Sequence, residues 1–369
     1  MAEGPGIRGL AVALVLAAAV ALYPVPGLSL AGRYALATMV FAGTLWITGA
    51  LPLALTALLV PVALVGLGVY ADFADAVAGF ADPVVFLLLA GFVLAEAMSA
   101  RGLDRRVAFL VLARVGRSPR RLVLGVMVAT AGLSMVVSNT ATVAMMVPIV
   151  VGLLAQVPGG RETAAPEAAE LPDAAPNLRA SLLLGTAYAA SVGGVGTLIG
   201  TPPNAIVVSQ LRELAGVEIT FLEWLGIGLP LVAVTLPLTW VVLTYVVYPP
   251  EAIDVSAARE AARREIEAAG PLSTRERRVV GVFALTAGLW LLGGFEFAVR
   301  DLLPAGWHTL LFGGSGPTAL GTAGHQGLLY FVLVGLLAIP ALVVSGAAEW
   351  EELLDVDWGT LILFGGGIS

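Results

Sequence analysis

The sequence predicts an all-α polytopic membrane protein, and three observations support that fold class. The 369 residues are 59% hydrophobic and only 12% charged, with a mean hydropathy of +0.95, whereas soluble domains carry roughly 25% charged residues. Segments of about 20 apolar residues, the length at which a helix crosses ~30 Å of hydrocarbon, recur along the whole chain. The alternating segments of ~10 residues that build a transmembrane β-barrel are absent from the sequence.

The apolar runs place the predicted helices, several of which are too short to cross a membrane alone. The expected ranges are 7–23, 34–48, 51–69, 83–100, 120–137, 141–156, 178–192, 204–214, 225–248, 277–293, 326–346 and 358–369. The first range also has features of a signal peptide. We interpret it as a retained helix because many further spans follow.

The charged residues between these runs predict the orientation in the membrane. Arginines gather at 101–121 and again at 259–278, and the positive-inside rule assigns both clusters to the cytoplasm. The connection at 70–82 has three aspartates and no arginine, so we expect it outside. Residues 255–269 predict a cytoplasmic amphipathic helix with Arg and Glu on one side. The Pro/Ala/Glu-rich segment 161–176 predicts a disordered cytoplasmic loop.

A polar interruption divides the apolar run at 120–156. The stretch SMVVSNTATVAMMVP, Ser134–Pro148, has Ser138, Asn139 and Thr140 in succession near its middle. Because both ends of the run adjoin cytoplasmic segments, we predict a re-entrant helical hairpin with its tip at this triplet. Non-helical backbone at membrane depth must be buried in protein or line an aqueous cavity.

A second interruption, GGVGTLIGTPPN at Gly193–Asn204, lies within the predicted broken helix at 178–214. Two consecutive prolines lack N–H donors and push Thr201 away from helical geometry. Four glycines allow the chain to bend, and Asn204 is placed to begin the next helix. Broken helices of this kind form the midplane sites of many secondary transporters. Uncharged oxygens there suit sodium. The alternative, that the small polar residues only serve helix packing, accounts poorly for two coincident breaks.

Both stretches resemble the paired signatures of the divalent anion/sodium symporter family, which contains dicarboxylate, citrate and sulfate transporters. The second motif is the more specific, and the resemblance covers nearly the whole chain. It implies an inverted-repeat elevator-type transporter, usually a homodimer, with a scaffold domain and a mobile transport domain. Scaffold helices are then expected at 1–82 and 215–356, the first transport repeat at 83–214, and the start of a second repeat at 357–369.

The resemblance also implies the roles of individual residues. Carried over by motif position, the sodium ligands are expected to be Ser134, Ser138, Asn139 and Gly200. The residues expected to bind a substrate carboxylate are Asn139, Thr140, Thr201 and Pro202. No cofactor is expected, and Na⁺ is the expected coupling ion.

One feature departs from the family pattern. Residues 359–369 resemble residues 84–98, which indicates the start of a second repeat, but no second Ser-Asn-Thr triplet occurs in this sequence. We therefore expect a C-terminally truncated member with an incomplete second repeat that does not transport by itself.

The expected function is sodium-coupled symport of small divalent anions, such as C4-dicarboxylates, by a multi-pass protein of the cell membrane. An anion exchanger and a carrier of sulfate or another oxyanion are alternatives, and a non-transporting membrane subunit or fragment is a further one. An enzyme is not expected, because no predicted span carries paired aspartates, a Ser/His pair or a His-Glu-x-x-His helix. The expected partners are the anion, membrane lipid and a second copy of the chain, and not nucleic acid. The absence of cysteine excludes disulfides and thiolate metal sites.

Overall fold

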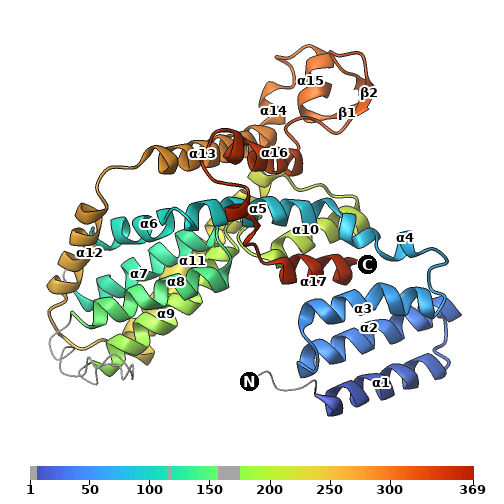
Figure 1. Ribbon diagram of the computed structural model, residues 1–369, viewed down its shortest axis with the longest axis horizontal. Helices are drawn as coiled ribbons and strands as arrows, with labels where there is room; N and C mark the ends of the chain where they lie inside the picture. The colour runs from blue at the N-terminus through green and yellow to red at the C-terminus, as the bar shows by residue number, and fades with distance from the viewer. Residues whose placement is uncertain (1–5, 115–117, 157–174) are drawn as a thin grey trace. The chain divides into compact units, whose positions relative to one another are not determined.

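The computed structural model of the chain describes residues 6–114, 118–156 and 175–369. It contains two compact units, which are residues 1–89 with 356–369, and residues 90–355. Helices dominate both units, and the sheet found among the described residues has two strands (Figure 1). The loop that the sequence predicts to be disordered lies, up to residue 174, outside the described residues.

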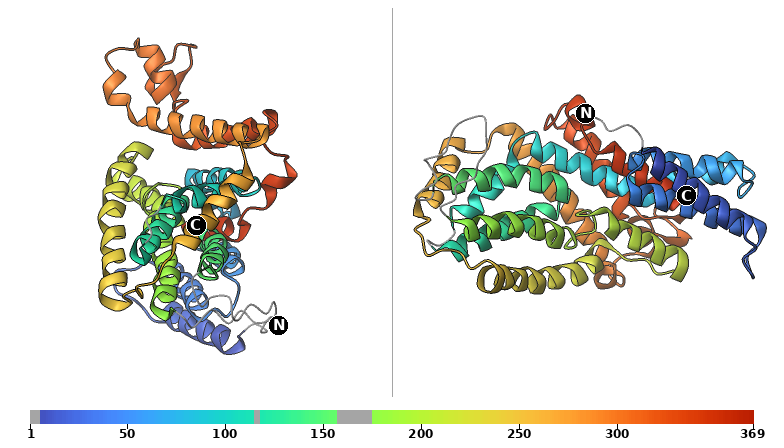
Figure 2. Two further views of the ribbon diagram at one scale, coloured as in Figure 1. Left: turned by 90° about the vertical axis from the view of Figure 1, so that its left-hand side faces the viewer. Right: turned by 90° about the horizontal axis from the view of Figure 1, so that it is seen from below.

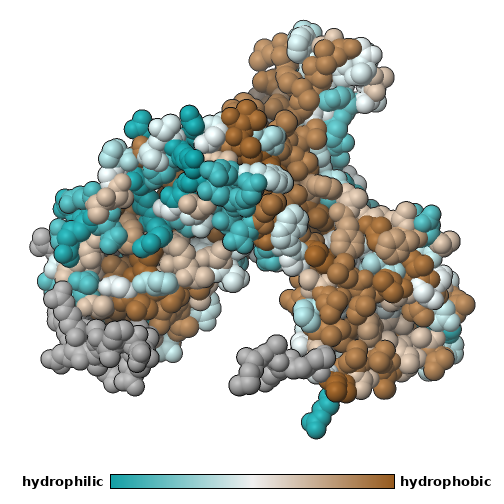
Figure 3. All heavy atoms as spheres, viewed as in Figure 1, coloured by the Kyte–Doolittle hydropathy of each residue, from teal (hydrophilic) through white to brown (hydrophobic). Residues whose placement is uncertain are grey.

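The first unit consists of apolar helices that pack side by side. Its main helices are α1 (Ile7–Leu22), α2 (Leu30–Thr48), α3 (Leu53–Gly66) and α17 (Trp358–Ile368). The short α4 (Phe73–Ala76), η1 (Ala78–Ala81) and the first half of α5 (Pro83–Ser99) complete it. Helix α1 packs along α2, and α17 packs on α3 although the two lie near opposite ends of the sequence. The outer faces remain apolar, as the 88% exposed Ile47 illustrates, and Figure 3 shows this over α1–α3.

The second unit is built around a bundle that contains both predicted breaks. The bundle comprises α7 (Pro119–Ser134), α8 (Asn139–Leu154), α9 (Pro176–Gly194), α10 (Pro202–Ala215) and α11 (Phe221–Val241), which continues as a π-helix (Val242–Val247). Helices α7, α8 and α9 lie side by side, as both views in Figure 2 show. Fully buried Met127, Met146 and Leu182 fill the space between them. Packing within the bundle therefore holds in place the helix ends that flank the two breaks.

Two amphipathic helices hold each other through their C-terminal carbonyls. They are α6 (Leu103–Leu112) and α12 (Ser256–Ala269). Arg106 donates to the carbonyls of Ala269 and Gly270 at 2.7 and 2.9 Å, and Arg259 donates to the carbonyl of Ala113 at 3.1 Å. Each arginine thus satisfies carbonyls that a helix end leaves without a partner. Polar residues gather over these two helices (Figure 3).

Helix α12 confirms the amphipathic helix predicted at 255–269, whereas α6 was missed. The sequence predicted only a connection between the helices at 83–100 and 120–137, but residues 103–112 within it form a helix that begins after Gly102 in the left-handed region. The polar face of α6 packs partly against α12. This contact joins segments 146 residues apart, so no local sequence pattern predicts it.

A small module follows the next long helix. After α13 (Thr274–Gly294) and α14 (Glu296–Val299), the chain forms α15 (Ala305–Phe312) and the antiparallel strands β1 (Gly314–Pro317) and β2 (Ala323–His325). It then returns through α16 (Phe331–Val344) and η3 (Glu351–Leu354). The sequence suggested no regular structure in this glycine-rich stretch, because its strands are too short to show a periodic pattern.

The described helices agree with a polytopic membrane protein. Among residues 6–114, 118–156 and 175–369, three helices are long and apolar enough to cross a membrane: α2, α11 with its π-helical end, and α13. Helices α5 and α6 meet the same criterion together, with a 70° bend between them. Several other apolar helices, including α1, α3 and α8, have only 10–17 residues. The apolar helices of the described chain thus include long spans, one bent pair and several helices too short to cross a membrane alone.

Helices α7 and α9 are in close contact at Gly193. A Cβ atom on Gly193 would lie 2.3 Å from the carbonyl oxygen of Ala131, so a side chain there would force the two helices apart. We expect Gly193→Ala to lower the free energy of unfolding by about 1–3 kcal/mol, as overpacking does. Thermal unfolding in detergent measures the effect.

Gly132→Ala provides the matched control on α7, because nothing lies within 4 Å of its Cβ position. It should leave stability unchanged or raise it by up to about 1 kcal/mol through helix propensity. Equal unfolding temperatures for Gly193→Ala and the parent protein would contradict the close contact.

The N-terminus of α9 is held by a carboxylate from a distant segment. Glu251 accepts hydrogen bonds from the backbone N–H groups of Asn177 and Leu178 at 2.9 and 3.0 Å. Burial by itself raises the pKa of Glu251, but these hydrogen bonds favour the charged form, and the net pKa lies below the ordinary glutamate value. Its stabilising effect is therefore present above the pKa of the unfolded chain, ~4.3.

Acidification should remove this stabilisation as the pH falls through the lowered pKa of Glu251 in the folded protein. We expect Glu251→Gln to be less stable than the parent protein at neutral pH. The difference between the two unfolding temperatures should shrink on acidification below the unfolded-state pKa. A difference that stays constant from neutral to strongly acidic pH would rule out this linkage.

Candidate functional site

The first break separates α7 from α8 over residues 135–138. Ser138 begins α8, and its hydroxyl accepts a hydrogen bond from the backbone N–H of Ala141 at 3.3 Å. Asn139 and Thr140 follow as the first residues of the helix. The Ser-Asn-Thr triplet therefore forms a helix N-terminus, as a serine followed by short polar residues favours. The hairpin interruption predicted within 120–156 lies at this break.

The second break separates α9 from α10 over residues 195–201. Thr201 is the extended residue before α10, and Pro202 and Pro203 occupy its first turn, where a missing N–H costs nothing. Asn204 is buried and points back into the break. Its Nδ2 donates to the carbonyl oxygens of Gly194 and Thr197, each at 2.8 Å. One side chain thus satisfies the carbonyl of Gly194 and adds a second donor to that of Thr197, which also accepts the backbone N–H of Gly200 at 3.3 Å.

The two breaks lie against each other. Thr197 of the second break donates its hydroxyl hydrogen to the carbonyl of Met135 in the first. A Cβ atom on Gly200 would lie 2.9 Å from the carbonyl oxygen of Ser134, and one on Gly194 would lie 2.4 Å from Asn139 Oδ1. Only residues without side chains permit this approach. The interruptions at 135–138 and 195–201 thus form one structural element.

A further helix supports this junction. Trp224 of α11 donates its indole N–H to the carbonyl of Val195 at 3.0 Å. On the same helix, a Cβ atom on Gly228 would lie 2.6 Å from that carbonyl oxygen. Helix α11 therefore covers the second break and satisfies another of its backbone acceptors.

Uncharged oxygens gather where the breaks meet. The hydroxyl oxygen of the fully buried Ser134 lies 2.6 Å from Asn139 Oδ1 and 2.8 Å from the carbonyl oxygen of Ala190. A serine hydroxyl has one hydrogen to donate, and both of its neighbours are acceptors. With the amide oxygen of Asn139 facing Ser134, as the structure shows, one hydroxyl hydrogen therefore lies between two acceptors, Asn139 Oδ1 and the carbonyl oxygen of Ala190. Neutral oxygens of hydroxyls, amides and carbonyls are the type of ligand that secondary transporters use for a coupling cation.

The helix ends around the junction have opposite polarities. Helices α7 and α9 end there, so their partially negative carbonyl ends face the junction. Helices α8 and α10 begin there, so their partially positive N–H ends do as well. In transporters with broken helices, carbonyl ends coordinate the cation and helix N-termini face anionic groups of the substrate. The junction has both kinds of helix end.

The structure brings together some of the sequence-predicted residues more clearly than others. Ser134, Asn139 and Gly200 lie in the oxygen-rich junction, while the hydroxyl of Ser138 caps α8. Thr140 is exposed in the first turn of α8, and Thr201 and Pro202 are half-buried at the start of α10. No hydrogen bond among the described residues joins Thr140 to α10.

Several residues of the junction were not singled out from the sequence. Thr197 and Trp224 bind carbonyls of the breaks, and Asn204 was expected only to begin α10. For Asn204 and Thr197, the signal was their place inside a glycine- and proline-rich interruption. Trp224 had no such signal, because it lies in an ordinary apolar helix.

These features define an integral membrane protein with interrupted helices, the class of architecture in which secondary transporters build their binding sites. Comparison with known proteins agrees. The family described as the sodium:sulfate symporter transmembrane region matches residues 7–369. The chain therefore belongs to the sodium:sulfate symporter family and is a multi-pass membrane protein.

Two similar proteins are both called sodium-dependent dicarboxylate transporter SdcS. The protein from Staphylococcus saprophyticus is 33% identical over 357 residues, which cover 94% of this chain and 63% of the relative. The protein from Staphylococcus aureus is 33% identical over 347 residues, which cover 92% of this chain and 61% of the relative. The chain thus spans about three fifths of the length of these relatives.

The two hydrogen bonds of Asn204 provide a direct test of the junction. Asn204→Leu retains a similar volume but removes the side-chain donor from both carbonyls. The carbonyl of Gly194 is then left unsatisfied, while that of Thr197 keeps the backbone N–H of Gly200. We expect a loss of about 2 kcal/mol or more in the free energy of unfolding, since an unsatisfied buried acceptor costs about 1–3 kcal/mol.

Gln210→Leu, a change of a half-buried amide on the same helix, is the control and should alter the unfolding temperature little. If Asn204→Leu were as stable as Gln210→Leu, the bridge between the two carbonyls would not stabilise the break.

Proposed function

We propose that the protein serves sodium-coupled symport of small divalent anions, with C4-dicarboxylates as the substrate class, across the cell membrane. The observation that carries this proposal is the junction where Ser134, Asn139 and Gly200 gather uncharged oxygens between two interrupted helices. The names of the relatives, sodium-dependent dicarboxylate transporter, support both the ion and the substrate class. The family description names sulfate, another divalent anion.

Sodium binds, in this proposal, to oxygens of Ser134, Ser138 and Asn139 and to the carbonyl of Gly200. The hydroxyl of Ser134 can donate its hydrogen to only one of its two acceptor neighbours at a time, and a bound cation would attract the oxygen that is left without it. Ser138 contributes a remaining lone pair, because its hydroxyl already accepts from Ala141. Neutral ligands suit an ion that must be released, since they hold it less strongly than carboxylates would. Among the described residues, no group of three or more His, Asp or Glu side chains forms an alternative metal site.

The anion binds next to the sodium ion, at the N-termini of α8 and α10. Asn139 and Thr140 belong to the first turn of α8, while Thr201 and Pro202 begin α10. At α8, backbone N–H groups and hydroxyls favour a carboxylate without a buried arginine. At α10, Pro202 and Pro203 have no N–H, so the hydroxyl of Thr201 and the positive end of the helix dipole contribute there. Occupancy of the sodium site then raises the affinity for the anion through direct attraction, which couples the two solutes.

The domain roles belong to the same proposal. Residues 83–214 act as the first transport repeat, residues 1–82 and 215–356 contribute the scaffold, and residues 357–369 begin a second repeat. The scaffold carries the contact between two copies in a homodimer. The resemblance to elevator-type transporters supports this division, and mass measurement in detergent tests the dimer.

Sodium binding tests the proposal most directly. Na⁺ should raise the unfolding temperature of the protein, because a ligand that binds only the folded state stabilises it. Equal concentrations of K⁺ or choline should not. Ser134→Ala and Asn139→Ala should each weaken the apparent Na⁺ affinity by about tenfold or more, the equivalent of at least 1.4 kcal/mol.

Ser191→Ala is the matched control, since Ser191 is an exposed serine on α9 whose hydroxyl binds only the carbonyl of Ala187 within its own helix. Its Na⁺ response should equal that of the parent protein. Identical Na⁺ titrations for Ser134→Ala and Ser191→Ala would exclude the site at the junction.

A further inference from the structure

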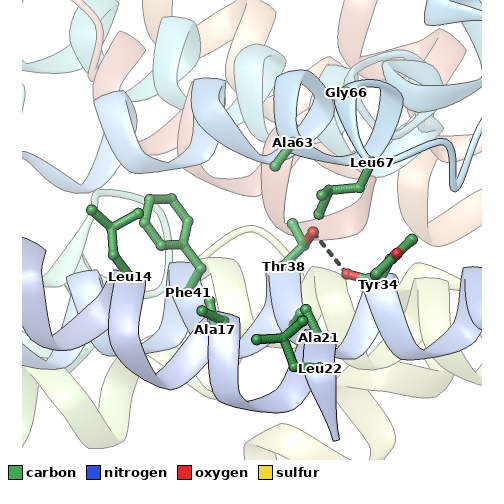
Figure 4. Close-up of a pocket in the computed structure, with 12 residues that line it drawn as sticks. Leu14, Ala17, Ala21, Leu22, Tyr34, Thr38, Phe41, Ala63, Gly66 and Leu67 are labelled. Carbon is green, nitrogen blue, oxygen red and sulfur yellow. Dashed lines mark hydrogen bonds between the residues drawn. The ribbon is translucent and has the colours of Figure 1, made fainter. Parts of the chain in front are cut away.

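A groove of about 650 Å³ opens between α1, α2 and α3, far from the interrupted helices in sequence and within the first unit alone. Figure 4 shows that it runs along the helices, with Leu14 and Phe41 toward one end and Tyr34 and Leu67 toward the other. Its volume lies in the range of sites that bind small molecules.

Small side chains on α1 create the space. The lining residues of α1 recur on one helical face, and three of them are Ala17, Ala18 and Ala21. The hydroxyl of Thr38 also lines the groove, but it donates to the carbonyl of Tyr34 at 3.0 Å (Figure 4). The interior therefore suits an apolar occupant better than water.

A cation lies beside the tyrosine end of the groove. The guanidinium carbon of Arg33 is 5.8 Å from the ring centre of Tyr34. Its Nε atom is buried without a hydrogen-bond partner, and among the described residues no carboxylate forms an ion pair with Arg33. Arg33 itself is half-buried and adjoins the lining residue Tyr34, and no described residue forms a hydrogen bond or ion pair with its guanidinium, so its terminal nitrogens are available to an anionic group beside this end of the groove.

We propose that this groove binds one acyl chain of an anionic phospholipid, with the phosphate group at Arg33. The lining residues extend from Leu14 to Leu22, eight steps of 1.5 Å, or about 12 Å along α1. That length approaches half of the ~30 Å hydrocarbon core, the depth of one leaflet. Arginine and tyrosine are the residue types that hold helix ends at the boundary with the headgroups.

The shape of the groove favours a lipid chain over a second copy of the protein. An α-helix with its side chains is about 10 Å across, so a neighbouring helix would cover the groove without entering it. A second copy would also need to bring a carboxylate to Arg33. A phospholipid supplies the narrow apolar chain and the anion in one molecule. This site does not depend on the proposed transport function.

Native mass spectrometry of the delipidated protein tests the proposal with two lipids that carry identical acyl chains, phosphatidylglycerol and phosphatidylcholine. The parent protein should retain phosphatidylglycerol with an affinity on the order of tenfold higher, because a charge-assisted hydrogen bond to Arg33 is available only to an exposed phosphate without a compensating headgroup cation. Arg33→Gln should abolish this preference and retain the weaker binding of phosphatidylcholine. Ala18→Trp should fill the groove and weaken the binding of both lipids.

Two matched variants complete the experiment. Ala19→Trp places the same side chain on α1 outside the groove, and Arg300→Gln removes an exposed arginine elsewhere, so both should retain the lipid preference. Equal affinities of the parent protein for the two lipids would overturn the proposal, as would unchanged lipid binding by Ala18→Trp. The proposal would also be overturned if Ala18→Trp changed the dimerisation of the protein without changing its lipid binding, because the groove would then hold a second copy of the chain. If Ala18→Trp fails to fold, Arg33→Gln decides. Loss of the preference for phosphatidylglycerol in this variant supports the proposal, and an unchanged preference overturns it.

Discussion

The structure depends on one constraint: a peptide group within the hydrocarbon of a membrane must find a hydrogen-bond partner inside the protein. Continuous helices satisfy it by themselves, but the breaks at 135–138 and 195–201 do not. Here the partners come from the second break itself and from the helices α10 and α11. Thr197 binds the carbonyl of Met135, Asn204 binds two carbonyls of its own break, and Trp224 covers a fourth acceptor from α11. Neither interruption would be tolerated without these partners.

The partial charges at the interrupted helix ends are also the physical reason why the candidate site needs no charged groups. The helix ends that the breaks create carry partial charges of both signs, so the proposed site for a cation and an anion requires no ionised side chains. An ionised residue buried there would cost several kcal/mol when either solute left. Hydroxyls, an amide and carbonyls remain stable in the empty junction because they bind one another, as Ser134 does with Ala190.

The membrane also determines how the rest of the chain is built. The reciprocal binding of Arg106 and Arg259 to helix carbonyls links α6 to α12 through polar contacts, whereas α1, α2 and α3 meet through apolar surfaces. Small residues bring helices together in both units. At Gly193 the result is close contact between α7 and α9, while the alanines of α1 leave a groove beside Arg33 that the protein does not fill.

The sequence by itself determined the class of protein, the positions of most apolar helices and both interruptions. These features follow from composition and from local residues such as Pro202, Ser138 and the apolar runs, whose effects act within a few positions along the chain. Tertiary structure alone decided that the two interruptions meet, that Asn204 bridges two carbonyls and that residues 103–112 form a helix against α12. The first and third outcomes rest on contacts between distant segments, Thr197 with Met135 at a separation of 62 residues and Arg259 with Ala113 at 146. The bonds of Asn204 span only 10 and 7 residues, but they form only because the chain folds back at the break. No local pattern records such contacts, because packing in three dimensions selects them.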